Sequence, residues 1–109
     1  MEKEEQRDQI IQKIEQFFKV SERVADKMQH VAEKVKGGYV LIETRPRWDG
    51  SSGPWTRSPI AKIIFHKPTG FWKIYWMRAS GKWEFYGKFK RLSRTLIEIK
   101  EDKHGCFWG

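Results

Sequence analysis

This sequence has little cysteine and no long hydrophobic run. Its 109 residues contain one cysteine, Cys106, which excludes an internal disulfide. No uninterrupted apolar stretch approaches the roughly 20 residues of a membrane-spanning helix, and the opening Met-Glu-Lys-Glu-Glu lacks the basic-then-apolar order of a signal peptide. We therefore expect a cytoplasmic protein without membrane association. Its length suits a single domain over residues 1–109, with one core and no separate catalytic domain.

Acidic residues are also scarce relative to basic ones. The chain has 14 Asp and Glu against 22 Lys and Arg, a formal net charge of +8. Residues 1–35 are nearly balanced, with 7 basic and 8 acidic residues, whereas residues 36–109 hold 15 basic and 6 acidic ones. A basic field attracts polyanions, nucleic acid first among them. The same charge would also keep an aromatic-rich domain soluble, so composition leaves both interpretations open.

Three β-rich segments between residues 59 and 87 are separated by Pro68-Thr69-Gly70 and Ala79-Ser80-Gly81, which are typical of tight turns. They predict an antiparallel meander. Because side chains alternate across a strand, one set is expected to face the core: Ala61, Ile63, Phe65, Trp72, Ile74, Trp76, Trp83 and Phe85. The other set is expected to face water or a partner: Lys62, Ile64, His66, Lys73, Tyr75, Met77, Glu84 and Tyr86.

Helices are expected at both ends of the chain. Apolar residues at 3–4 spacing predict an amphipathic helix over 4–19, and Ser21 suits the start of a short second helix ending near Met28. Ser93 is a candidate N-cap for a last helix over 94–102, after which the Gly-Cys-Phe-Trp-Gly tail is expected to dock onto the fold. The fold class is therefore α+β, with an antiparallel sheet of four or five strands.

Residues 29–36 fit two structures. Val-Ala-Glu-Lys-Val-Lys has helical propensity, whereas Gly37-Gly38 followed by Tyr-Val-Leu-Ile is a hairpin signal. We favour the hairpin, in which Val35 would lie opposite Val40 and Val31 opposite Thr44.

Several blocks occur in one characteristic order along the chain. They are Glu43-Thr44-Arg45-Pro46, Trp55-Thr56-Arg57-Ser58-Pro59-Ile60-Ala61, Gly70-Phe71-Trp72-Lys73-Ile74-Tyr75-Trp76, Gly81-Lys82-Trp83-Glu84-Phe85-Tyr86 and the ending Asp102-Lys103-His104-Gly105-Cys106-Phe107-Trp108-Gly109. This series resembles a small bacterial family catalogued as domain-of-unknown-function family 3024. The resemblance covers most of the chain and is weakest in residues 1–20. It implies a strand before the Gly-containing turn, which supports the hairpin, and it implies no activity.

The best functional signal is a basic and aromatic sheet surface. Aromatic rings stack on unpaired bases while Lys and Arg hold phosphates. The predicted register gathers His30, Lys34, Lys36, Tyr39, Arg45, Lys62, His66, Lys73, Tyr75 and Tyr86 on one surface. The Pro-, Gly- and Ser-rich loop 46–59 is expected to add a flap. The predicted nucleic-acid-binding residues are Arg45, Arg47, Trp48, Trp55, Arg57, Lys62, Lys73, Tyr75 and Tyr86.

Two other interpretations stay open: a surface with no binding function, and a surface that binds a protein. Glu43 and Glu84 would share that surface and could pair with Lys62 and Lys73, which would make it an ordinary solvated sheet. Alternatively, the Trp-rich loop and the Phe107-Trp108 tail would anchor a protein partner, because Trp and Arg dominate interface energetics. The oligomeric state is not predicted.

An enzyme fits the sequence less well. The carboxylates after residue 36 are not spaced to converge on a divalent cation, and Glu43-Thr44-Arg45 offers no tunable amine. His104 and Cys106 supply two metal ligands where a structural zinc site needs four. We therefore expect a non-enzymatic binding module without metal or cofactor.

Overall fold

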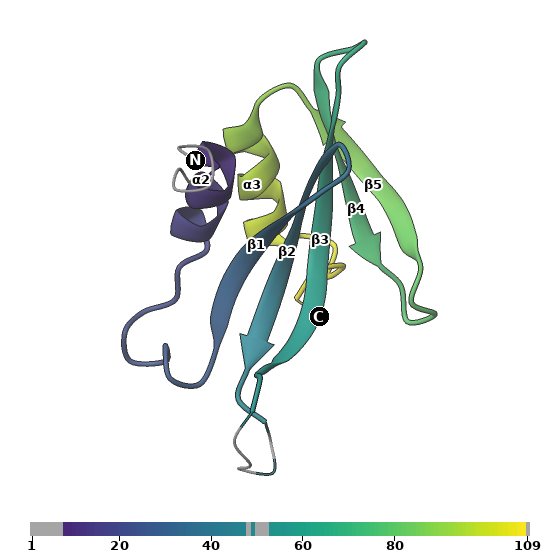
Figure 1. The fold of residues 1–109 in the computed structure, drawn as a ribbon. Helices are drawn as coiled ribbons and strands as arrows, with labels where there is room; N and C mark the ends of the chain where they lie inside the picture. The colour runs from purple at the N-terminus through teal and green to yellow at the C-terminus, as the bar shows by residue number, and fades with distance from the viewer. Residues whose placement is uncertain (1–7, 48, 50–52, 109) are drawn as a thin grey trace.

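The computed structural model describes residues 8–47, 49 and 53–108. The elements are α2 (Gln9–Phe17), β1 (Gln29–Val35), β2 (Gly38–Arg45), β3 (Thr56–His66), β4 (Phe71–Met77), β5 (Trp83–Phe89) and α3 (Leu92–Glu101). The strands form one antiparallel sheet in chain order, β1-β2-β3-β4-β5, with both helices on one side of it (Figure 1). The predicted α+β class is confirmed, with five strands. None of the described helices is long and apolar enough to cross a bilayer.

The core lies between the helices and one face of the sheet. Ile14 of α2 and Leu96 and Ile99 of α3 pack against sheet side chains that alternate along β1–β4. Those side chains are Ala32, Tyr39, Leu41, Ala61, Ile63 and Ile74, with Trp72 and Trp76 packed beside them. The core positions predicted for Trp72 and Trp76 are thus confirmed. We call the opposite side of the sheet the uncovered face.

Asp8 fixes the start of α2 and ties it to the sheet. Its carboxylate accepts hydrogen bonds from the Ile10 amide at 2.8 Å and from the Tyr39 hydroxyl at 2.8 Å. Burial opposes the charge, but these hydrogen bonds and Lys34 together hold the pKa of Asp8 below its usual range. The helix predicted over 4–19 is observed as Gln9–Phe17, with residues 1–7 outside the described part of the chain.

The β1–β2 hairpin is confirmed, but its predicted register is wrong. The turn is Lys36-Gly37, with Gly37 at φ +81°, and Val35 lies opposite Gly38 rather than Val40. Gly38 belongs to the strand because its backbone lies against β3: a Cβ there would stand 1.9 Å from the Ile63 carbonyl oxygen. The close approach of two backbones, which a dipeptide signal does not encode, moves the pairing by two residues.

Two other local predictions need correction. Residues 22–27 form consecutive turns, such as Val24 N–H to Ser21 O, instead of a regular second helix. The last helix begins at Leu92, so Ser93 lies inside it and is not its cap; Arg91 is the N-cap residue.

The C-terminal tail docks as predicted. Asp102, with φ +45°, ends α3, and its carboxylate accepts hydrogen bonds from the backbone amides of Phe107 at 3.0 Å and Trp108 at 2.8 Å. Phe107 is buried.

A β-bulge in β5 changes which side chains reach each face. Ile74 lies opposite Gly87 while Tyr75 lies opposite Phe85, so Tyr86 is an extra residue. Tyr86 turns toward the helices, and its hydroxyl donates a 2.6 Å hydrogen bond to Glu98. Trp83 and Phe85 consequently lie on the uncovered face. Their predicted core positions, and the outward position of Tyr86, are wrong.

Candidate functional site

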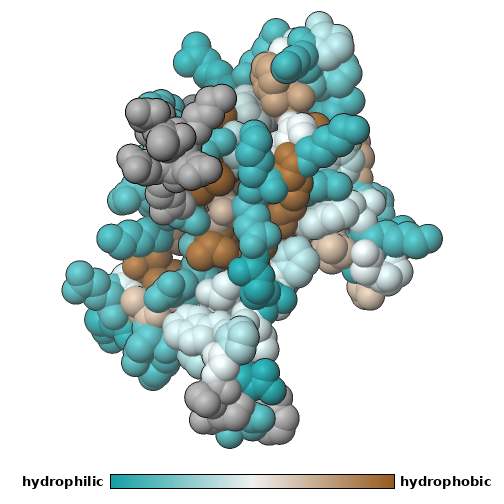
Figure 2. All heavy atoms as spheres, viewed as in Figure 1, coloured by the Kyte–Doolittle hydropathy of each residue, from teal (hydrophilic) through white to brown (hydrophobic). Residues whose placement is uncertain are grey.

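Aromatic and lysine side chains from β3, β4 and β5 gather on the uncovered face. Along β4, an aromatic ring, a lysine and a second ring follow one another on this face: Phe71, Lys73 and Tyr75. Strand pairing places Lys62, Tyr75 and Phe85 in one row across the sheet and Lys73 beside Lys88 in the next. We call the following set the aromatic–lysine patch: Lys62, Phe71, Lys73, Tyr75, Trp83, Phe85, Lys88 and Lys90. In the view of Figure 2, hydrophobic side chains show between hydrophilic ones over the middle of the sheet.

The lysines of the patch stand over its rings. Lys62 Nζ lies 5.4 Å from the Tyr75 ring centroid and 5.2 Å from that of Trp83. Lys88 and Lys90 each place Nζ 4.9 Å from the centroid of Phe71. These are cation–π distances. The ammonium groups are therefore held at the level of the ring faces instead of extending away from the sheet.

Phe85 is the most exposed large hydrophobic side chain in the described part of the chain, at 50%. Its ring lies edge-on to Tyr75, with centroids 5.7 Å apart and planes at 69°. Phenylalanine is usually buried, and core packing does not account for a half-exposed ring on the uncovered face, next to the bulge of β5. Among the residues of a sheet surface, such a ring is the one best placed to contact a ligand.

Acidic side chains are directed away from the patch. Glu84 is the one acidic residue within β3, β4 and β5. It lies opposite Trp76, on the helix side, and pairs with Arg78 at 3.2 Å. Glu43 also lies on the helix side, 3.3 Å from Arg45 and 3.9 Å from His30. The pairs of Glu43 with Lys62 and Glu84 with Lys73 that would have neutralised the surface are therefore not formed.

The structure brings together only part of the predicted binding set. Lys62, Lys73 and Tyr75 lie in the patch as expected. Arg57 reaches the uncovered face but makes an ion pair with Glu33 of β1. Tyr86, as shown above, lies on the helix side, as does Tyr39, whose ring is buried in the core.

The other predicted residues lie near the β2–β3 loop. Arg45 pairs with Glu43 on the helix side and Arg47 with Asp49 at 3.8 Å. Trp55 lines a hollow of about 260 Å³ with Gln29, Thr44, Pro54 and Arg57, and Trp48 lies outside the described residues. The loop is also shorter than predicted, because residues 56–59 pair with β2. The described residues of the loop and of the sheet therefore do not form one continuous binding surface.

The model of the family described as "Domain of unknown function (DUF3024)" matches residues 1–109, the whole chain. The chain belongs to this family. No curated protein and no solved structure matches it. The resemblance expected from the motif order is confirmed.

Five members of the patch in this DUF3024 domain were not in the predicted binding set: Phe71, Trp83, Phe85, Lys88 and Lys90. Lys88 lies in β5 and Lys90 directly after it, two residues apart, so that spacing was present in the sequence. Trp83 and Phe85 were assigned to the wrong face because nothing in the sequence marks the bulge at Tyr86.

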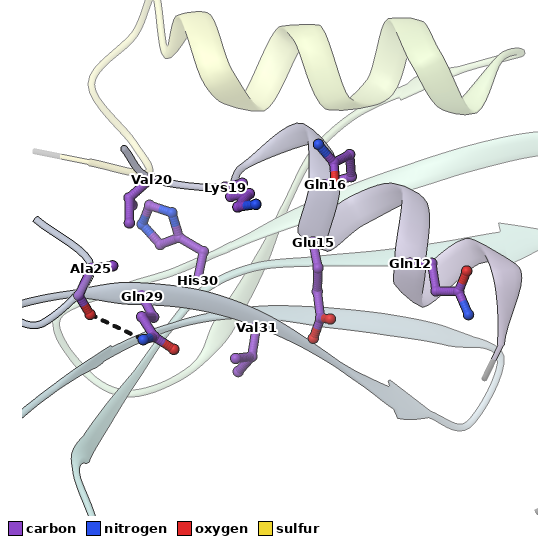
Figure 3. Close-up of a pocket in the computed structure, with 9 residues that line it drawn as sticks. All are labelled: Gln12, Glu15, Gln16, Lys19, Val20, Ala25, Gln29, His30 and Val31. Atoms are coloured by element: carbon purple, nitrogen blue, oxygen red, sulfur yellow. Dashed lines mark hydrogen bonds between the residues drawn. The ribbon is translucent and has the colours of Figure 1, made fainter. Parts of the chain in front are cut away.

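A second hollow, about 530 Å³, lies between α2 and β1 (Figure 3). Gln12, Glu15 and Gln16 of α2 line one wall, and Gln29, His30 and Val31 of β1 line the other. Glu15 Oε2 accepts a 3.0 Å hydrogen bond from the Ala32 amide and so covers the outer edge of β1. The described residues contain no group of three or more His, Cys, Asp or Glu placed to hold a metal ion.

Proposed function

We propose that this protein is a non-enzymatic module that binds single-stranded nucleic acid through the aromatic–lysine patch. The observation that carries the proposal is Phe85, half exposed and edge-on to Tyr75, on a part of the sheet that presents lysines and no acidic side chain. Unpaired bases stack on such rings, and each stacked base contributes about 1–3 kcal/mol. Lysines supply the charge that holds the phosphates.

The spacing of the patch supports this function. Side chains two residues apart on a strand lie about 6.6–6.8 Å apart on the same face. Phe71, Lys73 and Tyr75 therefore present ring, charge and ring at regular intervals along β4. Trp83 and Phe85 add two more rings on β5, and Lys88 adds a charge. A nucleic-acid strand lying over β4 and β5 would meet stacking surfaces and cations in alternation.

Lysines held over rings suit a ligand that offers both bases and phosphates. The Lys62, Lys88 and Lys90 ammonium groups are already at the level of the rings. A short rotation would move each one from the ring face to a phosphate, leaving the ring free for a base. Duplex nucleic acid hides its base faces, so this surface favours single strands.

Fluorescence anisotropy with short labelled single strands of DNA and RNA, and with matching duplexes, tests the proposal. We expect single strands to bind more tightly than duplexes. Three to four lysine–phosphate contacts predict a slope of log K against log salt of about −2 to −3 between roughly 50 and 200 mM. We expect Lys73→Glu to weaken binding at least about tenfold and to make the slope shallower.

Lys13→Glu, the same charge change on α2, is the matched control and is expected to leave affinity nearly unchanged. Equal losses in Lys73→Glu and Lys13→Glu would show general charge attraction and contradict a defined site. Absence of binding at low salt would overturn the proposal. The exposed Phe85 would then be the anchor of a protein interface, and a pull-down with the intact domain and with Phe85→Ala would be the next step.

A further inference from the structure

On the helix side of the sheet, a groove lies where the end of α2, the start of β1 and the C-terminal segment meet. Its volume is about 320 Å³, within the roughly 300–1,000 Å³ of small-molecule sites. The described residues that line it are Phe17, Phe18, Lys19, Val20, His30, Lys100 and Trp108. His30, Lys19 and Val20 also line the neighbouring hollow drawn in Figure 3, where they lie at one end.

The aromatic walls of the groove are fixed by hydrogen bonds and ring contacts. Trp108 Nε1 donates a 2.9 Å hydrogen bond to the Ile99 carbonyl, which orients the indole. His30 Nδ1 lies 2.7 Å from the Phe18 carbonyl oxygen, and its ring centroid is 5.1 Å from that of Trp108. Phe17 lies edge-on to Phe18 at 5.1 Å. A ligand would therefore enter a largely preformed site, which reduces the entropic cost of binding.

The charges around the groove are positive. Lys19 and Lys100 line it, and no acidic residue is among the described residues that do. Lys100 Nζ stands 4.9 Å from the Phe17 ring centroid and makes no ion pair with a described carboxylate. The nearest acid to His30 is Glu43, 3.9 Å from its Nε2, and Glu43 is already paired with Arg45. The groove therefore combines an aromatic interior with a cationic rim.

We propose that this groove binds a small planar aromatic carboxylate. The ring would lie between Phe17 and Trp108, and the carboxylate would pair with Lys100 and Lys19. Apolar walls with a few charged groups that set orientation are typical of small-ligand sites. The groove and the aromatic–lysine patch are on opposite sides of the sheet, so ligand binding in the groove does not depend on nucleic-acid binding by the patch.

The test follows the Trp108 indole N–H resonance by ¹H–¹⁵N NMR during titration of the full chain with three matched probes. Naphthoate carries the ring and the carboxylate, naphthylmethanol is neutral, and naphthylmethylammonium is cationic. We expect a saturable shift of the Trp108 resonance with naphthoate and at least about tenfold weaker binding of the other two. A tenfold difference corresponds to about 1.4 kcal/mol.

Two charge-reversal variants localise the site. Lys100→Glu, at the rim, is expected to weaken naphthoate binding at least about tenfold. Lys13→Glu, on the same helix as Phe17 but outside the groove, is expected to leave it within about twofold. Equal binding of the three probes, no saturable shift of Trp108, or equal losses in the two variants would overturn the proposal. Anisotropy measured with a labelled single strand on the same samples reports the patch separately.

Discussion

Tyr75 and Phe85 lie directly opposite each other on β4 and β5, edge to face, with ring centroids 5.7 Å apart. The pair exists because Tyr86 is an extra residue in β5 and turns toward the helices. One side chain thus leaves the surface that was predicted to bind, and its sequence neighbour becomes the exposed ring. The same bulge therefore has two effects: it lets Tyr86 bond to Glu98 of α3, and it leaves Phe85 on the uncovered face.

Tyr86→Phe is expected to destabilise the fold without changing the patch. Its hydroxyl donates to Glu98, whose side chain is 3% exposed. Loss of a hydrogen bond to a buried charge costs about 1.5–3 kcal/mol, with Arg94 and Lys103 limiting the loss at 3.1 and 3.5 Å. Urea unfolding measures this change. Tyr75→Phe, whose hydroxyl has no described hydrogen-bond partner, is the control and should shift stability by less than about 0.5 kcal/mol.

Much of the fold could be predicted because its determinants are local. The 3–4 spacing of Ile10, Ile14 and Phe17 marks α2, and Pro68-Thr69-Gly70 marks the β3–β4 turn. The register between β1 and β2 could not be predicted, because it depends on how closely Gly38 approaches the Ile63 carbonyl on a third strand, β3. Contacts between distant segments leave no period in the sequence.

The candidate site was predictable up to the bulge and not beyond it. Lys62, Lys73 and Tyr75 follow the alternation of β3 and β4, and the structure places them as expected. In β5, one inserted residue moves Tyr86 to the helix side and leaves Phe85 outside. Arg57, predicted as a binding residue of the loop, lies in β3 instead, and its ion-pair partner Glu33 comes from a strand more than twenty residues away.

Gly38→Ala and Gly87→Ala are expected to differ sharply although both glycines lie in strands. A Cβ at Gly38 would stand 1.9 Å from the Ile63 carbonyl oxygen, so the β2 and β3 backbones would have to separate. We expect a loss of at least about 2 kcal/mol in the free energy of unfolding. A Cβ at Gly87 meets nothing within 4 Å, so Gly87→Ala should leave stability unchanged or raise it by up to about 1 kcal/mol. Equal effects would contradict the observed register.

Stability should fall at alkaline pH through Tyr39. Burial and the hydrogen bond to Asp8 raise the pKa of Tyr39 to about 12, above its ordinary value near 10. The folded state therefore favours the neutral phenol. This contribution is complete below about pH 10 and is lost as pH rises toward about 12, by up to about 2 kcal/mol. Urea unfolding across this range measures it. Tyr39→Phe should make the fall shallower, while Tyr86, whose pKa is also raised by burial and by its hydrogen bond to Glu98, keeps part of the fall in place. An unchanged profile in Tyr39→Phe would show that Tyr39 does not contribute.

Comparing single-strand binding by Phe85→Ala and Phe65→Ala tests directly whether the aromatic–lysine patch binds nucleic acid. Both rings are exposed, at 50% and 38%, but Phe65 lies on the helix side beside Trp72. Loss of one stacking surface predicts that Phe85→Ala weakens binding by about 1–3 kcal/mol, roughly five- to 150-fold in Kd, while Phe65→Ala stays within about twofold. Equal affinities for Phe85→Ala and the unmodified chain would contradict the assignment of the uncovered face as the binding surface.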